Sequence, residues 1–197
     1  MAVAEMDDYW TARLQGNDPT SPVGDNNTAW ARSSGVDGDG SANAGGFWRI
    51  VSSGGGQIWK QTVADANNNL SLVCAIKFAS APTANTVIMA LDNGSHRIEV
   101  QSNGDLQKVK LVGATTVTSN DLDIGMAADT PVPLILRLTL ASDGTARLYM
   151  REIIEDDDAT QHYLSVTGSS SSSQGAFFGT TSGTVDFYTA YFTPHGS

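Results

Sequence analysis

Hydrophobic and polar residues alternate with a period of two along residues 133–153, which is typical of a β-hairpin. Every second residue from 134 to 140 is a leucine, and polar or smaller apolar residues fill the positions between them. Ala146, Leu148 and Met150 repeat the alternation after an Asp-Gly pair. The pattern therefore predicts two antiparallel strands that share one buried face.

The length of the turn decides which residues of this hairpin face each other. A two-residue turn would place Leu138 opposite Tyr149, whereas a three-residue loop, Ser142–Gly144, places Leu138 opposite Leu148. We expect the second register, because it brings the apolar positions of both strands together. It requires Gly144 to adopt a left-handed backbone conformation.

Similar patterns recur along most of the chain, separated by clusters of Gly, Asn and Ser. They predict strands at residues 29–33, 47–52, 57–63, 70–79, 162–166, 176–180 and 184–192. With the central hairpin and a meander that begins at residue 87 and continues through two Asn-Gly turns, this makes roughly a dozen short strands. The predicted fold is all-β, a jelly-roll sandwich of two antiparallel sheets with a non-regular N-terminal arm.

Within the meander, Asn-Gly pairs predict tight turns. A two-residue turn at Asn93-Gly94 sets Met89 opposite Ile98. The next Asn-Gly pair, read in the same way, sets Glu99 opposite Lys108 and predicts an ion pair on the outer face.

The N-terminal segment breaks the strand pattern. The first thirteen residues predict a short helix with Met6, Tyr9 and Trp10 near one side, and this helix is too short to be stable alone. Gly and Pro residues follow it, so we divide the chain into an arm, residues 1–27, and a sandwich, residues 28–197. The arm needs a surface to pack on, which makes its three large side chains candidates for contact with a partner.

The last predicted strand is apolar on both faces. Simple alternation assigns one face to Val185, Phe187 and Tyr191, and the other to Tyr188, Ala190 and Phe192. Such a strand is either central and covered or part of a subunit contact. The second alternative makes Phe187, Tyr188, Tyr191 and Phe192 candidate partner-binding residues.

The central hairpin, with its Asp-Gly turn and the return sequence Ala-Arg-Leu-Tyr-Met at 146–150, resembles that of concanavalin A-like and laminin-G-like domains. Residues 183–188, Gly-Thr-Val-Asp-Phe-Tyr, resemble the closing strand of the same domains. The resemblance covers roughly residues 28 to 193 and implies a jelly-roll fold. It departs at Arg151-Glu152-Ile153, where those domains usually have an Asp-Gly turn.

Charge and composition narrow the function classes. The 197 residues carry a net charge of −10, which disfavours nucleic acid and anionic membrane surfaces as partners. The chain lacks a signal-peptide pattern and an apolar run long enough for a membrane helix, so we expect synthesis in the cytosol. The single cysteine, Cys74, lies within an apolar alternation and is predicted to be a buried thiol.

Metal and catalytic motifs are weak. Residues 37–41, Asp-Gly-Asp-Gly-Ser, offer oxygen ligands but lack the bidentate Glu of a calcium loop, and residues 155–158 read as a solvated acidic loop. An ordinary turn is favoured over calcium at both, and no cofactor is predicted. His96, His162 and His195 have no metal-ligand spacing.

Glycoside hydrolases that resemble this fold carry an E-x-D-x-x-E strand motif, which is absent here. Asp186 in the closing strand is better explained as an ordering residue than as a catalyst. The prediction is therefore a protein without enzymatic activity.

Three tryptophans in the early strands, Trp30, Trp48 and Trp59, are candidates for stacking on sugars, although tryptophans often fill cores. Two functions remain open. The first is a structural virion protein, a bacteriophage head decoration (cement) or fibre protein that forms a homotrimer and binds a major capsid protein. The alternative is a lectin-like module that recognises a surface glycan.

Overall fold

The computed structural model describes residues 8–11, 31–34, 40–43, 47–52, 57–61, 69–80, 82–104, 108–119, 134–152, 162–171, 174–180 and 182–195. Up to residue 61 these ranges are described by backbone alone. Every regular element in them is a β-strand. The part of the chain so described contains no helix that is long and apolar enough to cross a membrane.

The strands form two antiparallel sheets. The eight-stranded sheet has the order β13 (His162–Thr167), β12 (Thr145–Glu152), β11 (Leu134–Leu140), β6 (Asn69–Ser80), β15 (Gly183–His195), β4 (Phe47–Ser52) and β3 (Gly40–Asn43), and β1 (Asp8–Thr11) also pairs with β15. The seven-stranded sheet has the order β10 (Thr116–Thr118), β9 (Val109–Val112), β8 (Arg97–Ser102), β7 (Val87–Asn93), β14 (Gln174–Thr180), β5 (Gln57–Gln61) and β2 (Ala31–Ser34). This is the predicted all-β, jelly-roll-type sandwich.

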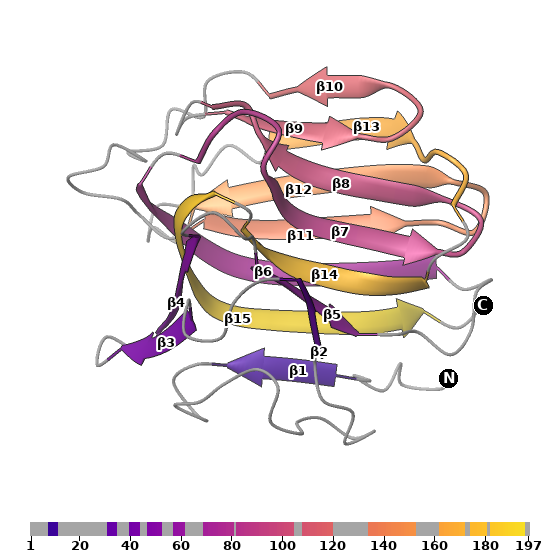
Figure 1. Ribbon diagram of the computed structural model, residues 1–197. Coiled ribbons are helices and arrows are strands. Elements are labelled where there is room, and N and C mark those ends of the chain that lie inside the picture. Colours follow the sequence, from indigo (N-terminus) through magenta and orange to yellow (C-terminus); the bar gives the residue numbers. More distant parts are fainter. Residues whose placement is uncertain are drawn as a thin grey trace.

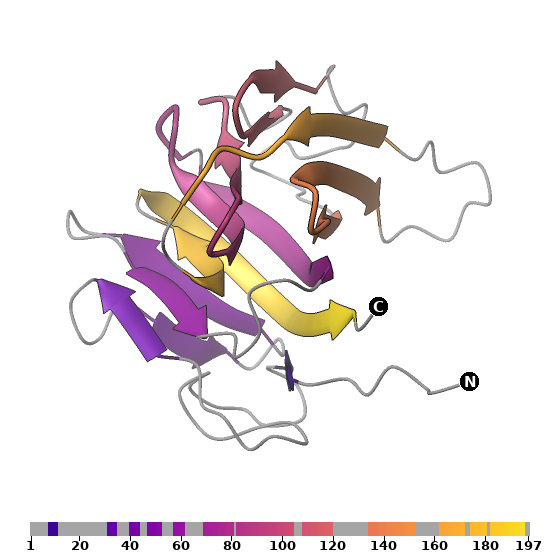
Figure 2. The ribbon, with the colours of Figure 1, turned by 90° about the vertical axis from the view of Figure 1, so that its right-hand side faces the viewer.

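The two sheets stack face to face, with β7, β8 and β14 in front of β11, β12 and β6 in the view of Figure 1. Figure 2 shows the same layers after a quarter turn. Alternate residues of both sheets point into one core, which includes the leucines of β11 at 0–1% exposure. Phe178 of one sheet meets Phe187 of the other with ring centroids 5.2 Å apart. The period-two pattern of the sequence is thus the direct cause of the layered core.

The central hairpin has the predicted register. Leu138 pairs with Leu148 and Leu136 with Met150 across the turn. Gly144 has a φ of +87°, the left-handed conformation that the three-residue loop requires.

The first turn of the meander differs from the prediction. Met89 pairs with Val100 and Leu91 with Ile98, two residues away from the expected register. The Asn93 side chain is the reason, because its Oδ1 accepts hydrogen bonds from the backbone of Ser95 at 3.0 Å and of His96 at 2.7 Å. These bonds close a longer loop than a two-residue turn.

The second turn is also longer than expected. Gln101 pairs with Lys110 and Ser102 with Val109, so the predicted pairing of Glu99 with Lys108 is wrong. The Glu99 carboxylate instead contacts Arg97 on its own strand at 2.8 Å.

The closing strand is central rather than exposed. β15 lies between β6 on one side and β4 and β1 on the other, and a bulge follows Phe187. The extra residue reverses the alternation, so Phe192 joins Phe187 in the core, at 2% and 0% exposure. The face assignment from simple alternation is therefore wrong beyond the bulge, and Phe187 and Phe192 are not available to a partner.

The arm contributes a strand where a helix was expected. Residues 8–11 form β1, in which Tyr9 pairs with Tyr191 and Trp10 with Ala190. Pairing with β15 gives this segment hydrogen-bond partners on an existing strand, whereas a short helix without a packing surface is only marginally stable. The arm thus includes a strand of the sandwich, while Met6 lies outside the described residues.

The Gly- and Ser-rich loop that follows β13 is held in place over residues 168–171. Gly168 donates to the Gly144 carbonyl at 2.7 Å, and Ser169 forms a bridge with Arg97. The Ser171 hydroxyl donates to Asp92 Oδ2 at 2.7 Å. Low sequence complexity did not indicate these contacts.

Candidate functional site

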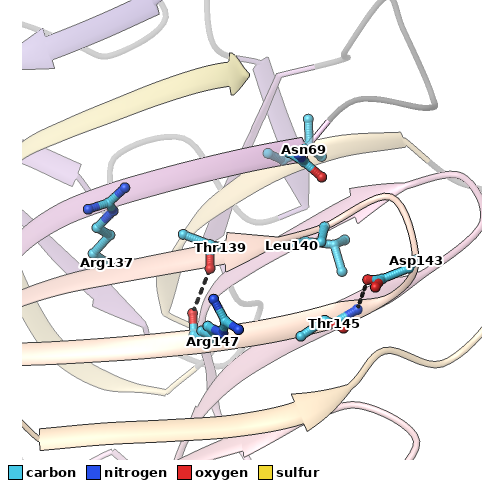
Figure 3. A pocket seen from close by; sticks show the side chains of 9 residues that line it. Asn69, Arg137, Thr139, Leu140, Asp143, Thr145 and Arg147 are labelled. Atoms are coloured by element: carbon cyan, nitrogen blue, oxygen red, sulfur yellow. Dashed lines mark hydrogen bonds between the residues drawn. The ribbon is translucent and has the colours of Figure 1, made fainter. Parts of the chain in front are cut away.

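The outward positions of the central hairpin line a pocket of about 280 Å³ on the eight-stranded sheet. Alternation places Arg137 and Thr139 of β11 and Arg147 of β12 on the face opposite the buried leucines. Thr139 pairs with Arg147, and Arg137 pairs with Tyr149, so the two arginines are diagonal neighbours. Figure 3 shows these side chains along the neighbouring strands.

Asp143 and Thr145, in and next to the turn, line the end of the pocket that lies away from Arg137 (Figure 3). Asp143 Oδ1 accepts a hydrogen bond from the Thr145 backbone at 2.8 Å. This bond, assisted by the Thr145 hydroxyl, lowers the pKa of Asp143. The carboxylate is therefore ionised at neutral pH and is held in a fixed direction.

Asn69, at the start of β6, joins the turn to the rest of the sheet. Its Oδ1 accepts a hydrogen bond from the Ser142 backbone at 2.9 Å, and its side chain lines the pocket. The Thr139 hydroxyl donates to the Arg147 carbonyl at 3.4 Å. Several lining groups are thus held by the sheet itself, which reduces the ordering cost of binding a ligand.

The pocket is chemically two-ended. Arg137 and Arg147 supply guanidinium donors at one end and along one side, and Asp143 supplies a carboxylate acceptor at the turn. The Thr139 hydroxyl lies beside Arg147, and the Asn69 amide lies on the neighbouring strand toward the turn (Figure 3). Neighbouring donors and acceptors of this kind suit a small polyhydroxylated molecule.

A second polar cluster lies at the same end of the molecule, on the seven-stranded sheet. Asp92 is fully buried and accepts hydrogen bonds from Gly94 at 2.8 Å and from Ser171 at 2.7 Å. Arg97 contacts Glu99 at 2.8 Å and lies 4.9 Å from the centre of the Phe177 ring. The hydrogen bonds of Asp92 join the loop after β7 to the loop after β13, so we assign this cluster a structural role.

Two buried polar atoms of this cluster, Asn93 Nδ2 and His96 Nδ1, have no hydrogen-bond partner among the described residues. Asn93 is the last residue of β7, and His96 lies in the loop that follows it, against Gly144. A bridging water is the usual solution for such a pair.

The structure places the candidate stacking residues by backbone only. Trp48 lies in β4 opposite Phe187, and Trp59 lies in β5 opposite Phe178. Trp30 lies outside the described residues. The two tryptophans placed by backbone belong to different sheets.

Cys74 is buried, as expected, and burial raises the pKa of its thiol. Tyr188 and Tyr191 lie in β15, described by backbone only, and Asp186 pairs there with Arg49 and Lys77. Among the described residues no group of three or more His, Cys, Asp or Glu side chains could hold a metal ion.

The two candidate calcium segments fall largely outside the described residues. Asp37 and Asp39 lie outside the described residues, as does the acidic run at 155–158. His162 and His195 lie in strands of known backbone, and His96 is half-buried in the β7–β8 loop.

The pocket arginines were missed at the sequence level, although a signal for them was present. Arg137 and Arg147 occupy solvent-facing positions of the clearest hairpin in a chain with only 11 Lys and Arg residues. Charged residues at outward strand positions are normally explained by solubility. The proximity of Arg137 and Arg147 follows only from the register of the hairpin, which places them as diagonal neighbours.

Comparison with family models and with curated proteins gave no match. Solved structures do match. Arcelin-5, a lectin-like defence protein from Phaseolus vulgaris, has a TM-score of 0.56 at 11% identity over 83% of this chain and 93% of its own. A carbohydrate esterase, vb_24B_21, from the Shiga toxin-encoding bacteriophage phi24B has a TM-score of 0.53 at 10% identity over 95% and 97%.

The binding domain of botulinum neurotoxin DC, solved in complex with SialylT, has a TM-score of 0.53 at 14% identity. The match covers 85% of this chain but only 45% of the toxin chain. Identities this low show a shared fold and no more. The chain therefore shares the β-sandwich fold of these proteins.

Proposed function

We propose that this chain is a carbohydrate-binding, lectin-like module and that the pocket of Arg137, Thr139, Asp143 and Arg147 is its binding site. The observation that carries the proposal is the pocket itself, in which guanidinium, hydroxyl, amide and carboxylate groups line one hollow of about 280 Å³. That size is near the lower end of the range for small-molecule pockets, which begins at about 300 Å³. The lectin-like fold supports the same assignment.

A bulky substitution in the pocket tests the proposal. Thr139→Trp fills the hollow from an outward strand position, and Thr118→Trp places the same side chain on exposed β10 of the other sheet as a control. We expect the unmodified chain and the control to bind at least one saccharide on a broad glycan array, and Thr139→Trp to lose that binding while keeping its circular dichroism spectrum. Absence of any saccharide ligand, or equal binding by both variants, would contradict the proposal.

Trp30, Trp48 and Trp59 remain proposed stacking residues. Alanine substitution at each should weaken saccharide binding if their rings contact the sugar. If the sugar instead lies only in the arginine pocket, the three alanine variants should bind it as the unmodified chain does.

We further infer that the module binds saccharide without chemically changing it, because the paired-carboxylate motif of related hydrolases is absent from the sequence. The phage esterase among the structural neighbours makes ester cleavage the activity to test. We expect no acetate release from acetylated saccharides. Release above the buffer rate would overturn this inference.

A second candidate, a structural protein of a bacteriophage particle, is supported by the match to a phage protein over nearly the full length of both chains. Attachment to a major capsid protein and a homotrimeric state belong to this candidate. Burial of Phe187 and Phe192 removes one reason for a trimer, because the closing strand no longer needs a subunit to cover it. Light scattering tests the trimer, and mass spectrometry of purified particles tests incorporation.

A further inference from the structure

Both pocket arginines are exposed, and they lie on the same face of one hairpin. Side chains at diagonal positions of adjacent strands lie about 7–8 Å apart, within reach of each other for long residues. Like charges so placed repel, which is a small cost in the unliganded protein because both side chains are exposed to water. A bound anion between them would remove that cost.

Within the described ranges, neither Arg137 nor Arg147 has a carboxylate within ion-pair distance. Arg97, by contrast, has Glu99 at 2.8 Å and Asp92 at 3.6 Å. Arg137 lies over the Tyr149 ring, with its guanidinium carbon 5.9 Å from the ring centre. That contact orients the guanidinium without supplying a negative charge to pair with it.

The Asp143 carboxylate lines the same pocket and must be weighed against an anionic ligand. It sits at the turn, at the end away from Arg137 (Figure 3), and accepts a hydrogen bond from Thr145 at 2.8 Å. An anionic group would therefore settle toward the arginines, and Asp143 would accept hydrogen bonds from hydroxyl groups at the other end. A monosaccharide that carries one acidic group on one side offers this arrangement.

We propose that the pocket selects acidic saccharides, with Arg137 and Arg147 binding the carboxylate of a uronic or sialic acid residue. This inference rests on the proposed function and deepens it. The planar guanidinium matches a carboxylate with two parallel hydrogen bonds, which a lysine cannot reproduce. Selectivity over neutral sugars thus comes from charge and from geometry together.

The test compares matched saccharides by isothermal titration calorimetry. The probes are N-acetylneuraminic acid and three disaccharides that differ only in their terminal residue, which is glucuronate, glucose or glucose 6-sulfate. The variants are Arg137→Gln, Arg147→Gln and Arg147→Lys, and Lys110→Gln on the other sheet removes one positive charge as the control. We expect at least one carboxylate probe to bind about 10-fold or more tighter than the neutral one.

Each Arg→Gln variant should lose about 10- to 100-fold in affinity for the carboxylate probe, the range of a charge-assisted hydrogen bond. Arg147→Lys should lie between Gln and the unmodified chain, and Lys110→Gln should bind normally.

The outcomes separate the two proposals. Equal binding of neutral and acidic probes, unchanged by Arg→Gln, would overturn acid selectivity while leaving the carbohydrate-binding function intact. Tightest binding of the sulfate probe would overturn the carboxylate assignment. Failure of every probe here and on the array would overturn both.

Discussion

At the scale of single residues, Gly144 shows how closely the hairpin turn and its neighbour fit. Its φ of +87° disfavours any residue with a Cβ, and a Cβ there would lie 2.9 Å from His96 Cε1 and Nδ1. We expect Gly144→Ala to lower the free energy of unfolding by about 1–3 kcal/mol, measured by urea denaturation. The double variant Gly144→Ala/His96→Ala should recover the part of this stability loss that comes from contact with His96. It should not recover the part that comes from the strained backbone at residue 144.

Equal stability of Gly144→Ala and the unmodified chain would contradict this account of the turn. A double variant no more stable than the two single losses combined would show that His96 makes no contact with residue 144.

Asp143 gives a prediction about pH. Its pKa is lowered first by the Thr145 backbone hydrogen bond and then by the Thr145 hydroxyl, so the ionised form is favoured in the folded state. Its contribution to stability is present above the pKa of the unfolded chain and is lost as pH falls through the lower, folded value. We expect Thr145→Val to raise the pKa of Asp143 only part of the way toward its ordinary value, because the backbone bond remains.

An NMR titration of the Asp143 carboxyl carbon measures this shift. The same titration of Asp143 in the Thr139→Val variant is the control and should be unchanged. If Thr145→Val leaves the pKa of Asp143 where it was, the hydroxyl has no part in holding the carboxylate.

At the scale of elements, the period-two pattern predicted which segments form strands. It predicted the register of two strands only where a wrong pairing would set the apolar face of one strand against the polar face of the other. In the central hairpin a two-residue turn would have set Leu138 against Tyr149, so the apolar pattern decided the register. In the β7–β8 hairpin the observed pairing of Leu91 with Ile98 lies two residues from the predicted one. A shift of two preserves every face, so side-chain hydrogen bonds in the turn, such as those of Asn93, decide between the two registers.

The candidate site was less predictable than the fold, for a related reason. The outward position of Arg137 and Arg147 could be read from alternation, but their proximity depends on the register of β11 with β12. The part played by Asn69 depends on contact between residues 73 positions apart in sequence, which no local pattern encodes.

The strand β1 carries a prediction about the edge of the eight-stranded sheet. It covers residues 189–192 of β15 on the side that β4 leaves free. We expect deletion of residues 1–11 to expose this edge and cause concentration-dependent association, since an unpaired edge strand offers backbone groups to other chains. Multi-angle light scattering over a range of concentrations measures it.

A truncated chain that stays as dispersed as the full chain at every concentration would contradict a protective role for β1. Circular dichroism of the truncated chain serves as the control, because the remaining strands should keep their signal.

At the scale of the whole molecule, the net charge of the chain opposes the binding of an anion at the pocket. The chain carries a net charge of −10, which repels an anionic saccharide at long range, while Arg137 and Arg147 attract it at contact. Salt screens the two effects over different distances, because the screening length falls from about 30 Å at 0.01 M to about 10 Å at 0.1 M and 3 Å at 1 M. Moderate salt removes the repulsion first.

We therefore expect the affinity for the glucuronate disaccharide to rise between about 0.01 and 0.1 M NaCl and to fall again toward 1 M, where contact charges are screened as well. Calorimetric titration across this range measures it, with any neutral saccharide ligand from the array as a control whose affinity should stay flat. A steady fall from the lowest salt would mean that the acidic surface has no influence at the pocket. A flat profile for the acidic probe would mean that Arg137 and Arg147 do not bind its charge.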